Sequence, residues 1–395
     1  MRILCLTSRL PYPPDRGDRL RAYHFLEHLS AAHELSLVSF IAGEEERRHI
    51  EPLRTFCRDV QVLRRQPWQS VVSVASNGWR PVPLQVLYYQ SGAMRRLVNQ
   101  MLRDCRFDVV YVHLFRMAPY VADLEGTYRV VDLTDAISEE MARSLRYRGL
   151  VSRWLYRLER ARIERYERQV VLSVDETWLI SEADRQVLAA KCPAARLQVV
   201  QNGVDTDRFF PTREPCEPDR LIFVGHLRVF HNVDAALHLV RDILPRVRQQ
   251  VPNCTLQIVG TDPSPQVRRL AAEPGVTVTG FVPDLNGALN QASVFVAPLR
   301  FAAGVQNKVL EAFATGRPVV TTSLVNSGLG ARPGEEVLVA DDPETMASLV
   351  VTLLQDEGLR AQFGQAGLEF VRRTYRWEQV VERMKVIEKS VAGGP

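Results

Sequence analysis

The stretch that decides the fold is residues 297–322, APLRFAAGVQNKVLEAFATGRPVVTT. A short apolar strand at 294–297 leads into a loop that ends at Gly304, and apolar residues then recur at helical spacing as far as Gly316. A second strand follows at 319–322, after the glycine cap and a proline have stopped the helix. The pattern predicts a strand–helix–strand unit whose loop lies at a strand's carboxyl end, where open α/β sheets bind ligands.

Two charged residues stand near the start of that helix. Lys308 and Glu311 are three residues apart and therefore share one face. A cation in the first turn is electrostatically disfavoured, because the helix N-terminus already carries partial positive charge. The conflict disappears if an anion binds there, held by backbone N–H groups, Lys308 and Arg300, while Glu311 accepts hydrogen bonds from a diol such as a ribose. The alternative is a surface Lys–Glu pair worth about 0.3–0.5 kcal/mol, and the residues alone leave both interpretations open.

Strands and helices alternate along the whole chain, which predicts an α/β protein with parallel sheets. The strands expected in the first half are 2–8, 35–41, 60–63, 109–112, 130–133 and 177–180. Those expected in the second half are 221–224, 255–259, 276–279, 294–297, 319–322 and 337–339. A helix is expected at 44–57. The alternation indicates two Rossmann-like, doubly wound domains that face a central cleft.

The boundary between the domains is expected near residue 212. The segment 197–212, LQVVQNGVDTDRFFPT, closes the first half with a strand and an Asn-Gly turn signal. The polar, proline-containing segment 212–220 has the composition of an inter-domain linker. We therefore expect a first domain over 1–212 and a second domain that begins at 213.

Composition limits the class of protein. With 395 residues, 46% hydrophobic and 24% charged, the chain has the length and make-up of a globular protein of two domains. It contains no apolar run long enough to span a membrane, and its start has no secretory signal, so a cytoplasmic protein is expected. Its six cysteines are scattered without metal-type spacing and are expected to be reduced, and no metal-binding motif appears.

The basic residues gather in the first half of the chain. Residues 1–170 hold 27 Arg and Lys against 20 Asp and Glu. Within them, 143–168 carries nine Arg and three Glu, interleaved with Trp154 and with other aromatic and aliphatic side chains. This amphipathic pattern is typical of a helix pair that contacts an anionic membrane surface. The alternative is a solvated face with a core-facing stripe; no recognition motif supports nucleic acid.

The opening of the chain resembles a nucleotide-binding fold without its dinucleotide fingerprint. A strand is followed by a proline-rich loop that ends at Gly17 and Asp18, and a helix begins near Arg19. The loop does not read GxGxxG. We assign Gly17 and Asp18 to the acceptor or phosphate side of a site, with a simple turn requirement for Gly17 as the alternative.

Three polar residues end the strands that precede the domain boundary. His113 ends the strand at 109–112, where such a histidine points into a cleft more often than into the core. A structural role for His113 is the alternative. Asp132 and Asp135 end the next strand and either line the same cleft or, for Asp135, cap the following helix.

Taken together, these segments resemble the family 4 retaining glycosyltransferases of the GT-B fold over essentially the whole chain. The segments that carry the resemblance are QNGVDTDRFFPT, FVGHLRVFHNVDAA, GFVPDLNGALNQASVFVAPLR and, most specifically, GVQNKVLEAFATGRPVV. The closing YRWEQVVERM is similar to the family's last helix, which implies that residues 376–395 pack back on the first domain. PYPPDRGDRLRAYHFL, VVDLTDA and APLRFAAGVQNKVLEAFA are most similar to the subgroup that accompanies exosortase (PEP-CTERM) systems.

The resemblance implies roles for residues of the second domain. Glu311 matches the second glutamate of the family's E-x7-E motif, which holds the ribose, whereas Ala303 stands where the first glutamate belongs. Donor-sugar contacts are then expected from the backbone around Gly304, Val305, Gln306 and Asn307. The family's basic pair after the second domain's first strand is also altered: Gly225 is kept, but His226 follows it.

Further roles follow from the same resemblance. Arg300 and Lys308 replace the missing basic residues in neutralising the diphosphate, Val282 lies where the family contacts the base, and His113 matches the cleft histidine near the reacting centre.

The resemblance also implies the reaction. A sugar moves with retention and without a metal from a UDP- or GDP-linked donor to a glycan or lipid-linked acceptor, in envelope or exopolysaccharide synthesis. In the family the leaving phosphate accepts the acceptor's proton, so no carboxylate base is required. One alternative is a non-hydrolysing nucleotide-sugar epimerase. The other is a non-catalytic sugar-nucleotide-binding partner protein, which Ala303 keeps open.

Overall fold

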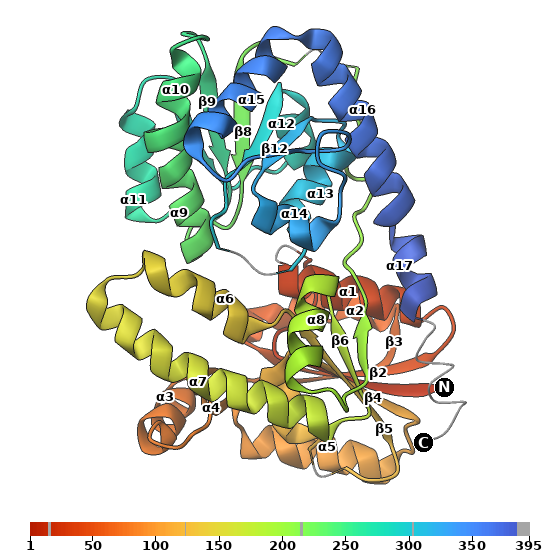
Figure 1. Cartoon of the computed structure of the whole chain (residues 1–395). Coiled ribbons are helices and arrows are strands. Elements are labelled where there is room, and N and C mark those ends of the chain that lie inside the picture. Colours follow the sequence, from red (N-terminus) through yellow and green to blue (C-terminus); the bar gives the residue numbers. More distant parts are fainter. Residues whose placement is uncertain (15–16, 123, 214–215, 302–303, 385–395) are drawn as a thin grey trace. The chain divides into compact units, whose positions relative to one another are not determined.

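The computed structural model describes residues 1–14, 17–122, 124–213, 216–301 and 304–384, with the side chains of Val381, Arg383 and Met384 left out. The chain divides into two compact units (Figure 1). Unit 1 comprises Met1–Gln201 and the chain from Val381 on, and unit 2 comprises Asn202–Val380.

These limits differ from the predicted domain boundaries after residues 212 and 375. The segment that leads to residue 212 packs within unit 2 through its backbone. The Val204 N–H donates to the Tyr375 carbonyl (2.7 Å), and the Thr212 N–H donates to Asn290 Oδ1 (2.9 Å).

Unit 1 contains a parallel sheet in the order β3-β2-β1-β4-β5-β6-β7. Its strands are β1 (Arg2–Thr7), β2 (Glu34–Ile41), β3 (Cys57–Arg64), β4 (Val109–His113), β5 (Tyr128–Thr134), β6 (Glu176–Leu179) and β7 (Leu197–Val199). Its helices are α1 (Gly17–Leu29), η1 (Glu44–His49), α2 (Glu51–Arg54), α3 (Pro67–Asn77), α4 (Leu84–Tyr89), α5 (Gly92–Asp104), η2 (Phe115–Tyr120), α6 (Ile137–Ser144), η3 (Leu145–Tyr147), α7 (Leu150–Ser173) and α8 (Glu182–Lys191).

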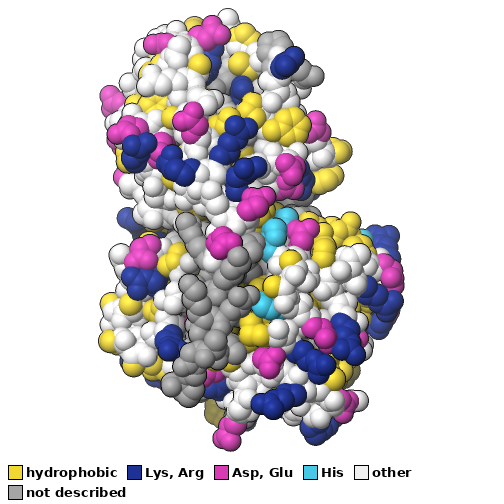
Figure 2. Space-filling view, turned by 90° about the vertical axis from the view of Figure 1, so that its right-hand side faces the viewer, with side chains coloured by type: hydrophobic (Ala, Val, Ile, Leu, Met, Phe, Trp, Pro, Cys, Tyr) yellow, Lys and Arg dark blue, Asp and Glu magenta, His cyan; other side chains and the backbone are white. Residues whose placement is uncertain are grey.

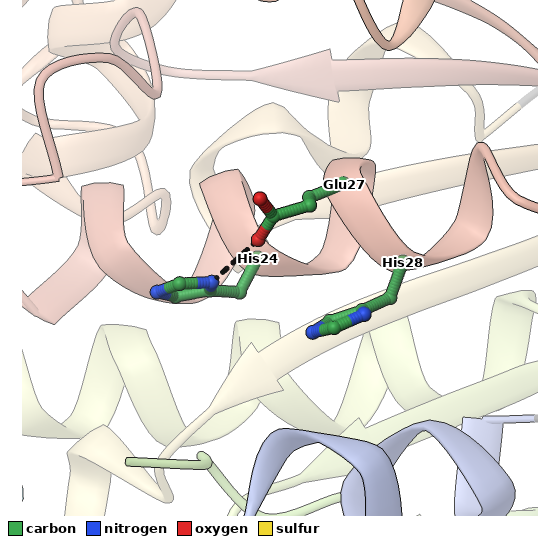
Figure 3. A group of neighbouring side chains, drawn as sticks. All are labelled: His24, Glu27 and His28. Atoms are coloured by element: carbon green, nitrogen blue, oxygen red, sulfur yellow. Dashed lines mark hydrogen bonds and ion pairs between the residues drawn. The ribbon is translucent and has the colours of Figure 1, made fainter. Parts of the chain in front are cut away.

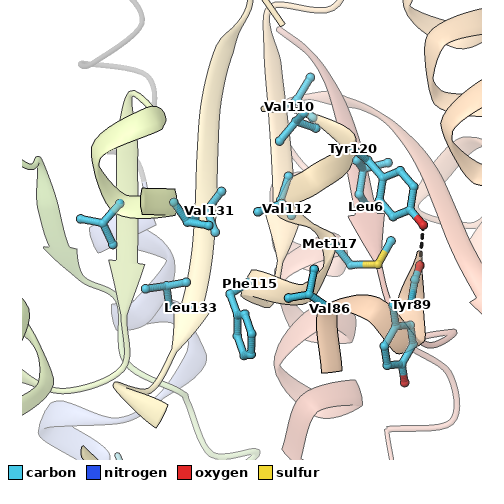
Figure 4. Close-up of a cluster of buried hydrophobic side chains, with 14 of the residues drawn as sticks. Leu6, Val86, Tyr89, Val110, Val112, Phe115, Met117, Tyr120, Val131 and Leu133 are labelled. Carbon is cyan, nitrogen blue, oxygen red and sulfur yellow. Dashed lines mark hydrogen bonds between the residues drawn. The ribbon is translucent and has the colours of Figure 1, made fainter. Parts of the chain in front are cut away.

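The core of unit 1 follows from the alternation of side chains along its strands. Val110 and Val112 of β4 join a buried cluster with side chains from α4, α5, α7 and α8 on one face of the sheet (Figure 4). Tyr111, between them, contacts Phe25 of α1, with ring centroids 6.2 Å apart. Helices therefore cover both faces of the sheet, as expected for a buried parallel sheet.

One predicted helix of unit 1 is wrong. Residues 44–57 form a 3-10 turn (η1) and the short helix α2, and Cys57 already belongs to β3. Cys57 pairs with Leu35 in the sheet and is buried, so packing and strand pairing override the local helical preference.

Unit 2 repeats the topology with the order β10-β9-β8-β11-β12-β13. Its strands are β8 (Arg220–Val224), β9 (Thr255–Val259), β10 (Val276–Gly280), β11 (Val294–Ala297), β12 (Val319–Thr321) and β13 (Leu338–Val339). The helices are α9 (Phe230–His238), the π-helical turn η4 (Leu239–Ile243), α10 (Leu244–Arg248), α11 (Pro265–Arg268), η5 (Arg269–Ala272), α12 (Leu285–Asn290), α13 (Asn307–Ala314), α14 (Ser323–Leu329), α15 (Pro343–Gln355), α16 (Glu357–Thr374) and α17 (Trp377–Met384).

The predicted strand–helix–strand unit is confirmed as β11, α13 and β12. Gly316, just beyond α13, has φ +68°, the left-handed conformation that glycine adopts most readily at a helix end. In both sheets the strand order reverses beside the first strand, between β1 and β4 in unit 1 and between β8 and β11 in unit 2. Such switch points are where open α/β sheets leave a crevice at the strands' carboxyl ends.

Candidate functional site

The switch point of unit 2 brings Lys308 against the end of β8. The Lys308 ammonium donates to Asn232 Oδ1 and lies 5.4 Å from the centre of the Phe223 ring. Asn232 Nδ2 in turn donates to the His226 carbonyl (3.1 Å). A side chain at Gly225 would come within 2.9 Å of the Asn232 amide, so Gly225 keeps room for this arrangement. Gly225 and Lys308, two of the predicted site residues, are thus brought together.

Glu311 is half-buried on the same helix as Lys308. Burial raises the pKa of Glu311 to about 7, against the opposing effect of Arg208 and Lys308. Burial also lowers the pKa of Lys308 to about 7, against the opposing effect of Glu311. Both side chains therefore lose part of their charge near neutral pH, and a ligand with complementary groups would restore it.

Arg300 is placed differently from the expectation of a cation held for an anion alone. Its guanidinium donates to both carboxylate oxygens of Asp234 on α9, at 2.9 and 2.6 Å. Only a third of the Arg300 side chain is exposed. Asp234 therefore offsets part of the charge that the sequence assigned to the diphosphate, and Arg300 stays a predicted anion ligand.

The loop before α13 holds the other predicted binding residues of unit 2. Gly304 has φ +60°, a conformation that few residues other than glycine adopt. Val305 is buried, Gln306 precedes the first turn of α13, and Asn307 accepts a hydrogen bond from Asn202 Nδ2 (2.9 Å). That bond ties the QNGVD segment to the start of the helix.

Two further positions were predicted for the donor site, Val282 and Ala303. Val282 is half-buried after the carboxyl end of β10, at the edge of the same sheet. Ala303, where the sequence lacks a motif glutamate, lies outside the described residues.

In unit 1 the switch point holds His113 in a buried polar network. His113 is 2% exposed, and its Nδ1 lies 3.5 Å from the Tyr111 hydroxyl and 3.6 Å from Asp132 Oδ2. Arg21 donates to both oxygens of Asp132, at 2.7 and 3.0 Å, and Tyr111 donates at 2.7 Å. Although burial alone would raise the pKa of Asp132, Arg21 and His113 hold it well below its ordinary value. Asp132 therefore stays ionised.

This network fixes one side of the His113 ring. Within the described part of the chain, His113 Nε2 is buried without a hydrogen-bond partner. With Nδ1 beside an ionised carboxylate, the favoured tautomer carries its proton there and leaves Nε2 as an acceptor. The ring is arranged as a histidine that receives or orients a hydroxyl group would be.

Asp18 lies beside the same network. It accepts a hydrogen bond from Arg9 Nη1 (3.2 Å), and Arg116 Nη2 is 3.7 Å away. Burial would raise the pKa of Asp18, but Arg9, Arg116 and His113 together lower it. Asp18 and His113, predicted from separate segments, thus act on each other, and exposed Gly17 begins the helix beside them.

Asp135 does not cap the following helix. The residue before α6 is Ala136, and no side chain caps that end. Burial, with Asp184 and Glu140, raises the pKa of Asp135 well above its ordinary value. The carboxyl of Asp135 is therefore harder to ionise than an ordinary aspartate, whereas that of Asp132 is easier to ionise.

Several residues of these two networks were missed by the sequence reasoning. They are Arg21, Tyr111, Asn202, Arg208, Asn232 and Asp234. Four of them lie in segments that carry the family resemblance, namely Asn202, Arg208, Asn232 and Asp234. Polar side chains in such segments could have been predicted as site residues. Arg21 lies in PYPPDRGDRLRAYHFL, which carries the subgroup resemblance, but an arginine in an amphipathic helix is ordinarily a surface residue and was interpreted as one.

Among the described residues, one group has ligand atoms close enough to share a metal ion. His24, Glu27 and His28 project from one face of α1, with these atoms within 4.8 Å of one another (Figure 3). His24 Nδ1 lies 2.9 Å from Glu27 Oε2, so an ordinary histidine–carboxylate hydrogen bond accounts for this contact. The expectation that no metal takes part in function stays a prediction.

The arginine-rich segment 143–168 spans the end of α6, η3 and most of α7, as the predicted helix pair requires. On the face shown in Figure 2, basic and acidic side chains are interspersed over both units. None of the described helices combines the length and apolar character needed to cross a membrane.

The two parallel sheets define the GT-B fold, and comparisons with known proteins agree. Sucrose-phosphate synthase of Thermosynechococcus elongatus superposes with a TM-score of 0.73 and 14% identity, covering 99% of each chain. Anabaena Alr3699/HepE, solved with UDP and glucose, gives a TM-score of 0.71 and 14% identity over 99% of this chain and 100% of that one.

Sequence comparison indicates which class of GT-B protein the chain is similar to. Residues 218–356 match the family described as glycosyl transferases group 1. Over 210 residues the chain is 29% identical to a phosphatidyl-myo-inositol mannosyltransferase of Mycobacterium tuberculosis, covering 49% of this chain and 54% of that protein. The chain thus spans about half the length of the curated relatives it matches. Together the matches support a GT-B glycosyltransferase family.

Proposed function

We propose that the protein is a retaining glycosyltransferase that moves a sugar from a UDP- or GDP-linked donor to a lipid-linked glycan in envelope or exopolysaccharide synthesis. The observation that carries the proposal is the position of Lys308 at the switch point of unit 2, where its ammonium donates to Asn232 beside Gly225. Burial there lowers the pKa of Lys308 and raises that of Glu311, each to about 7. A nucleoside diphosphate supplies what each lacks: anionic oxygens for Lys308 and a ribose diol for Glu311.

The chemical step needs two contributions from the chain. Lys308, Arg300 and the N–H groups at the start of α13 stabilise the negative charge that develops on the departing diphosphate. His113, whose Nδ1 lies 3.5 Å from the Tyr111 hydroxyl and 3.6 Å from Asp132 Oδ2, offers Nε2 to orient a substrate hydroxyl group. The glycosidic bond breaks, the leaving phosphate takes the acceptor's proton, and the new bond forms on the same face of the sugar. No carboxylate base and no metal enter this scheme, so EDTA is expected to leave transfer unchanged.

Titration with sugar nucleotides tests the donor part of the proposal. UDP-, GDP- and ADP-sugars are added separately, and thermal unfolding of the protein is followed. A donor at 100 times its dissociation constant stabilises the protein by about 2.7 kcal/mol, which is readily visible as a shift of the midpoint. No shift with any of the three would contradict donor binding.

The acceptor part rests on the arginine-rich segment 143–168. Each basic residue near an anionic surface contributes about 1 kcal/mol, an effect that fades within a Debye length. The name of the mycobacterial relative specifies a lipid, phosphatidyl-myo-inositol, which fits a lipid-linked acceptor at the cytoplasmic face of the membrane. The similarity to the exosortase-associated subgroup belongs to this proposal as well. Binding to anionic vesicles that weakens at high salt is the expected result.

A further inference from the structure

Helix α3 exposes three of its large apolar side chains to solvent, although one of its polar residues is buried. Trp68, Val71 and Val72 are 63%, 62% and 56% exposed, whereas the buried residue of α3 is Ser70. Trp79, just beyond the helix, is 76% exposed. Trp68, Val71 and Val72 follow the i, i+3, i+4 spacing of one helix face and form a single stripe, and Trp79 lies just beyond the C-terminal end of that stripe. An amphipathic helix packed for water would have the opposite orientation.

The first half of α7 has the same inverted character. Leu150, Val151, Trp154, Leu155 and Leu158 are all exposed. The buried residues of this helix begin only at Ile163 and are confined to its second half. The sequence reasoning singled out this segment for its arginines, but exposure of its apolar side chains is what the structure adds.

Two hydrogen bonds join α7 to the chain that follows α3. Arg162 Nη2 donates to the Gly78 carbonyl (2.6 Å), next to Trp79, and the Leu84 N–H donates to Glu159 Oε1 (2.6 Å). Leu158 lies one turn before Arg162 and therefore on the same side of α7. Figure 1 shows α3 and α4 alongside α7. The helices that carry the exposed apolar residues thus lie side by side, and we call these residues together the α3–α7 face.

Basic side chains border the α3–α7 face. Helix α3 itself, PWQSVVSVASN, has no charged residue. Arg64 precedes it, Arg80 follows it, and Arg146 and Arg157 flank the start of α7, all of them exposed. An apolar stripe that carries tryptophans at its ends and is bordered by cations complements the boundary between headgroups and acyl chains of an anionic bilayer.

We propose that α3 inserts into the interfacial layer of an anionic lipid bilayer, beside the start of α7. This deepens the membrane part of the proposed function and rests on it, since it adds the element that penetrates the lipid. A spanning helix needs about 20 residues, so α3 lies in the plane of the interface. The arginines supply attraction to the surface, and the α3–α7 face supplies the apolar area that is removed from water.

Vesicle binding by surface variants tests the inference. Full-length protein is floated with vesicles of phosphatidylcholine, with and without phosphatidylglycerol. Trp68→Ser combined with Val72→Ser is expected to lower the partition coefficient onto anionic vesicles at least about tenfold. Leu172→Ser is the matched control, because Leu172 is also exposed on α7 but lies 14 residues, about 21 Å, beyond Leu158. It should bind as the parent does.

A spectroscopic measurement identifies the inserted element. Lipids with brominated acyl chains should quench tryptophan fluorescence of the parent on vesicle binding. Replacing Trp68 and Trp79 by phenylalanine should remove the part of this quenching that α3 contributes and leave the part that comes from Trp154 at the start of α7. The replaced side chains are exposed, so unchanged thermal midpoints are expected and serve as the check of folding.

Three other outcomes would contradict the proposal, each in a different part. If the Trp68→Ser, Val72→Ser protein binds anionic vesicles like the parent, α3 is not the inserted element, while the membrane part of the proposed function stands. If the parent binds no vesicles, both fail, and donor-induced thermal shifts still report on sugar-nucleotide binding separately. If the parent is a dimer without lipid and only dimerisation is lost in the variant, the α3–α7 face is an interface between two copies.

Discussion

The two switch points share a topology but handle charge in opposite ways. Beside β1 and β4, Asp132 is fully enclosed and is matched by Arg21 and Tyr111. Beside β8 and β11, Lys308 and Glu311 are half-buried, and each has a pKa moved to about 7. One site is electrostatically complete within the protein, whereas the other is incomplete.

The difference separates positioning from binding. A buried ion pair with its hydrogen bonds satisfied holds its neighbours in place but has little left to offer a ligand. A partly desolvated charge without a full set of partners gains most when a complementary ligand arrives. We therefore expect substitutions beside β4 to act on stability and turnover, and substitutions beside β11 to act on donor affinity.

The largest effect is expected at Asp132. Asp132→Asn leaves the Arg21 guanidinium buried without its counter-charge, which typically costs about 3–5 kcal/mol. Because the pKa of Asp132 is lower in the folded state, its contribution is present above the unfolded carboxyl pKa and is lost as pH falls through the folded value. Urea unfolding at neutral and acidic pH measures both.

Asp135→Asn is the matched control at the same strand end. Its carboxyl already has a raised pKa, so an amide in its place should leave stability at neutral pH unchanged or slightly higher. Equal destabilisation by both variants would mean that the Arg21–Asp132 pair has no special weight.

The next effect is on turnover. His113→Ala should lower kcat about a hundredfold with donor affinity nearly unchanged, because the His113 contact is expected to matter mainly in the transition state. His33→Ala is the control, since His33 precedes β2 at the amino ends of the parallel strands, whereas His113 lies at the carboxyl end of β4. Steady-state kinetics with a bound-donor titration separates the two quantities. An unchanged kcat would make His113 structural.

The features that the sequence predicted correctly are those that depend on residues close together along the chain. The alternation of strands and helices, and the unit around 297–322, depend on neighbouring residues and were predicted. The Arg21–Asp132 pair joins residues 111 positions apart, and nothing near Arg21 distinguishes it from a surface arginine. The exposed stripe of α3 was missed for a related reason: its periodicity is that of a core-facing helix, and only the packed structure shows which way it faces.

A smaller effect is expected on donor affinity. Glu311→Ala should weaken sugar-nucleotide binding by at least about 1 kcal/mol, the range of a lost hydrogen bond to a charged group. Glu335→Ala, a mostly exposed carboxylate of the same unit, should bind like the parent. Isothermal titration of both variants decides. Unchanged affinity in Glu311→Ala and in Lys308→Ala would return the pair to a structural Lys–Glu contact.

The smallest expected effect is the uptake of a fraction of a proton when the donor binds, and it tests the difference between the two switch points most directly. In the free protein the pKa of Lys308 is about 7, so at pH 8 much of its population is uncharged. A bound diphosphate favours the ammonium form and raises that pKa, which requires the complex to take up protons from the buffer. The apparent binding enthalpy at pH 8 should therefore vary with the ionisation enthalpy of the buffer, and the slope should indicate proton uptake.

Lys308→Ala should abolish the slope while the protein stays folded. The ionised Asp132 network has no comparable proton to exchange at this pH, so Tyr111→Phe should leave the slope as it is in the parent. A slope of zero in the parent would mean that Lys308 does not meet the donor, and that the incomplete charges of unit 2 serve the fold alone.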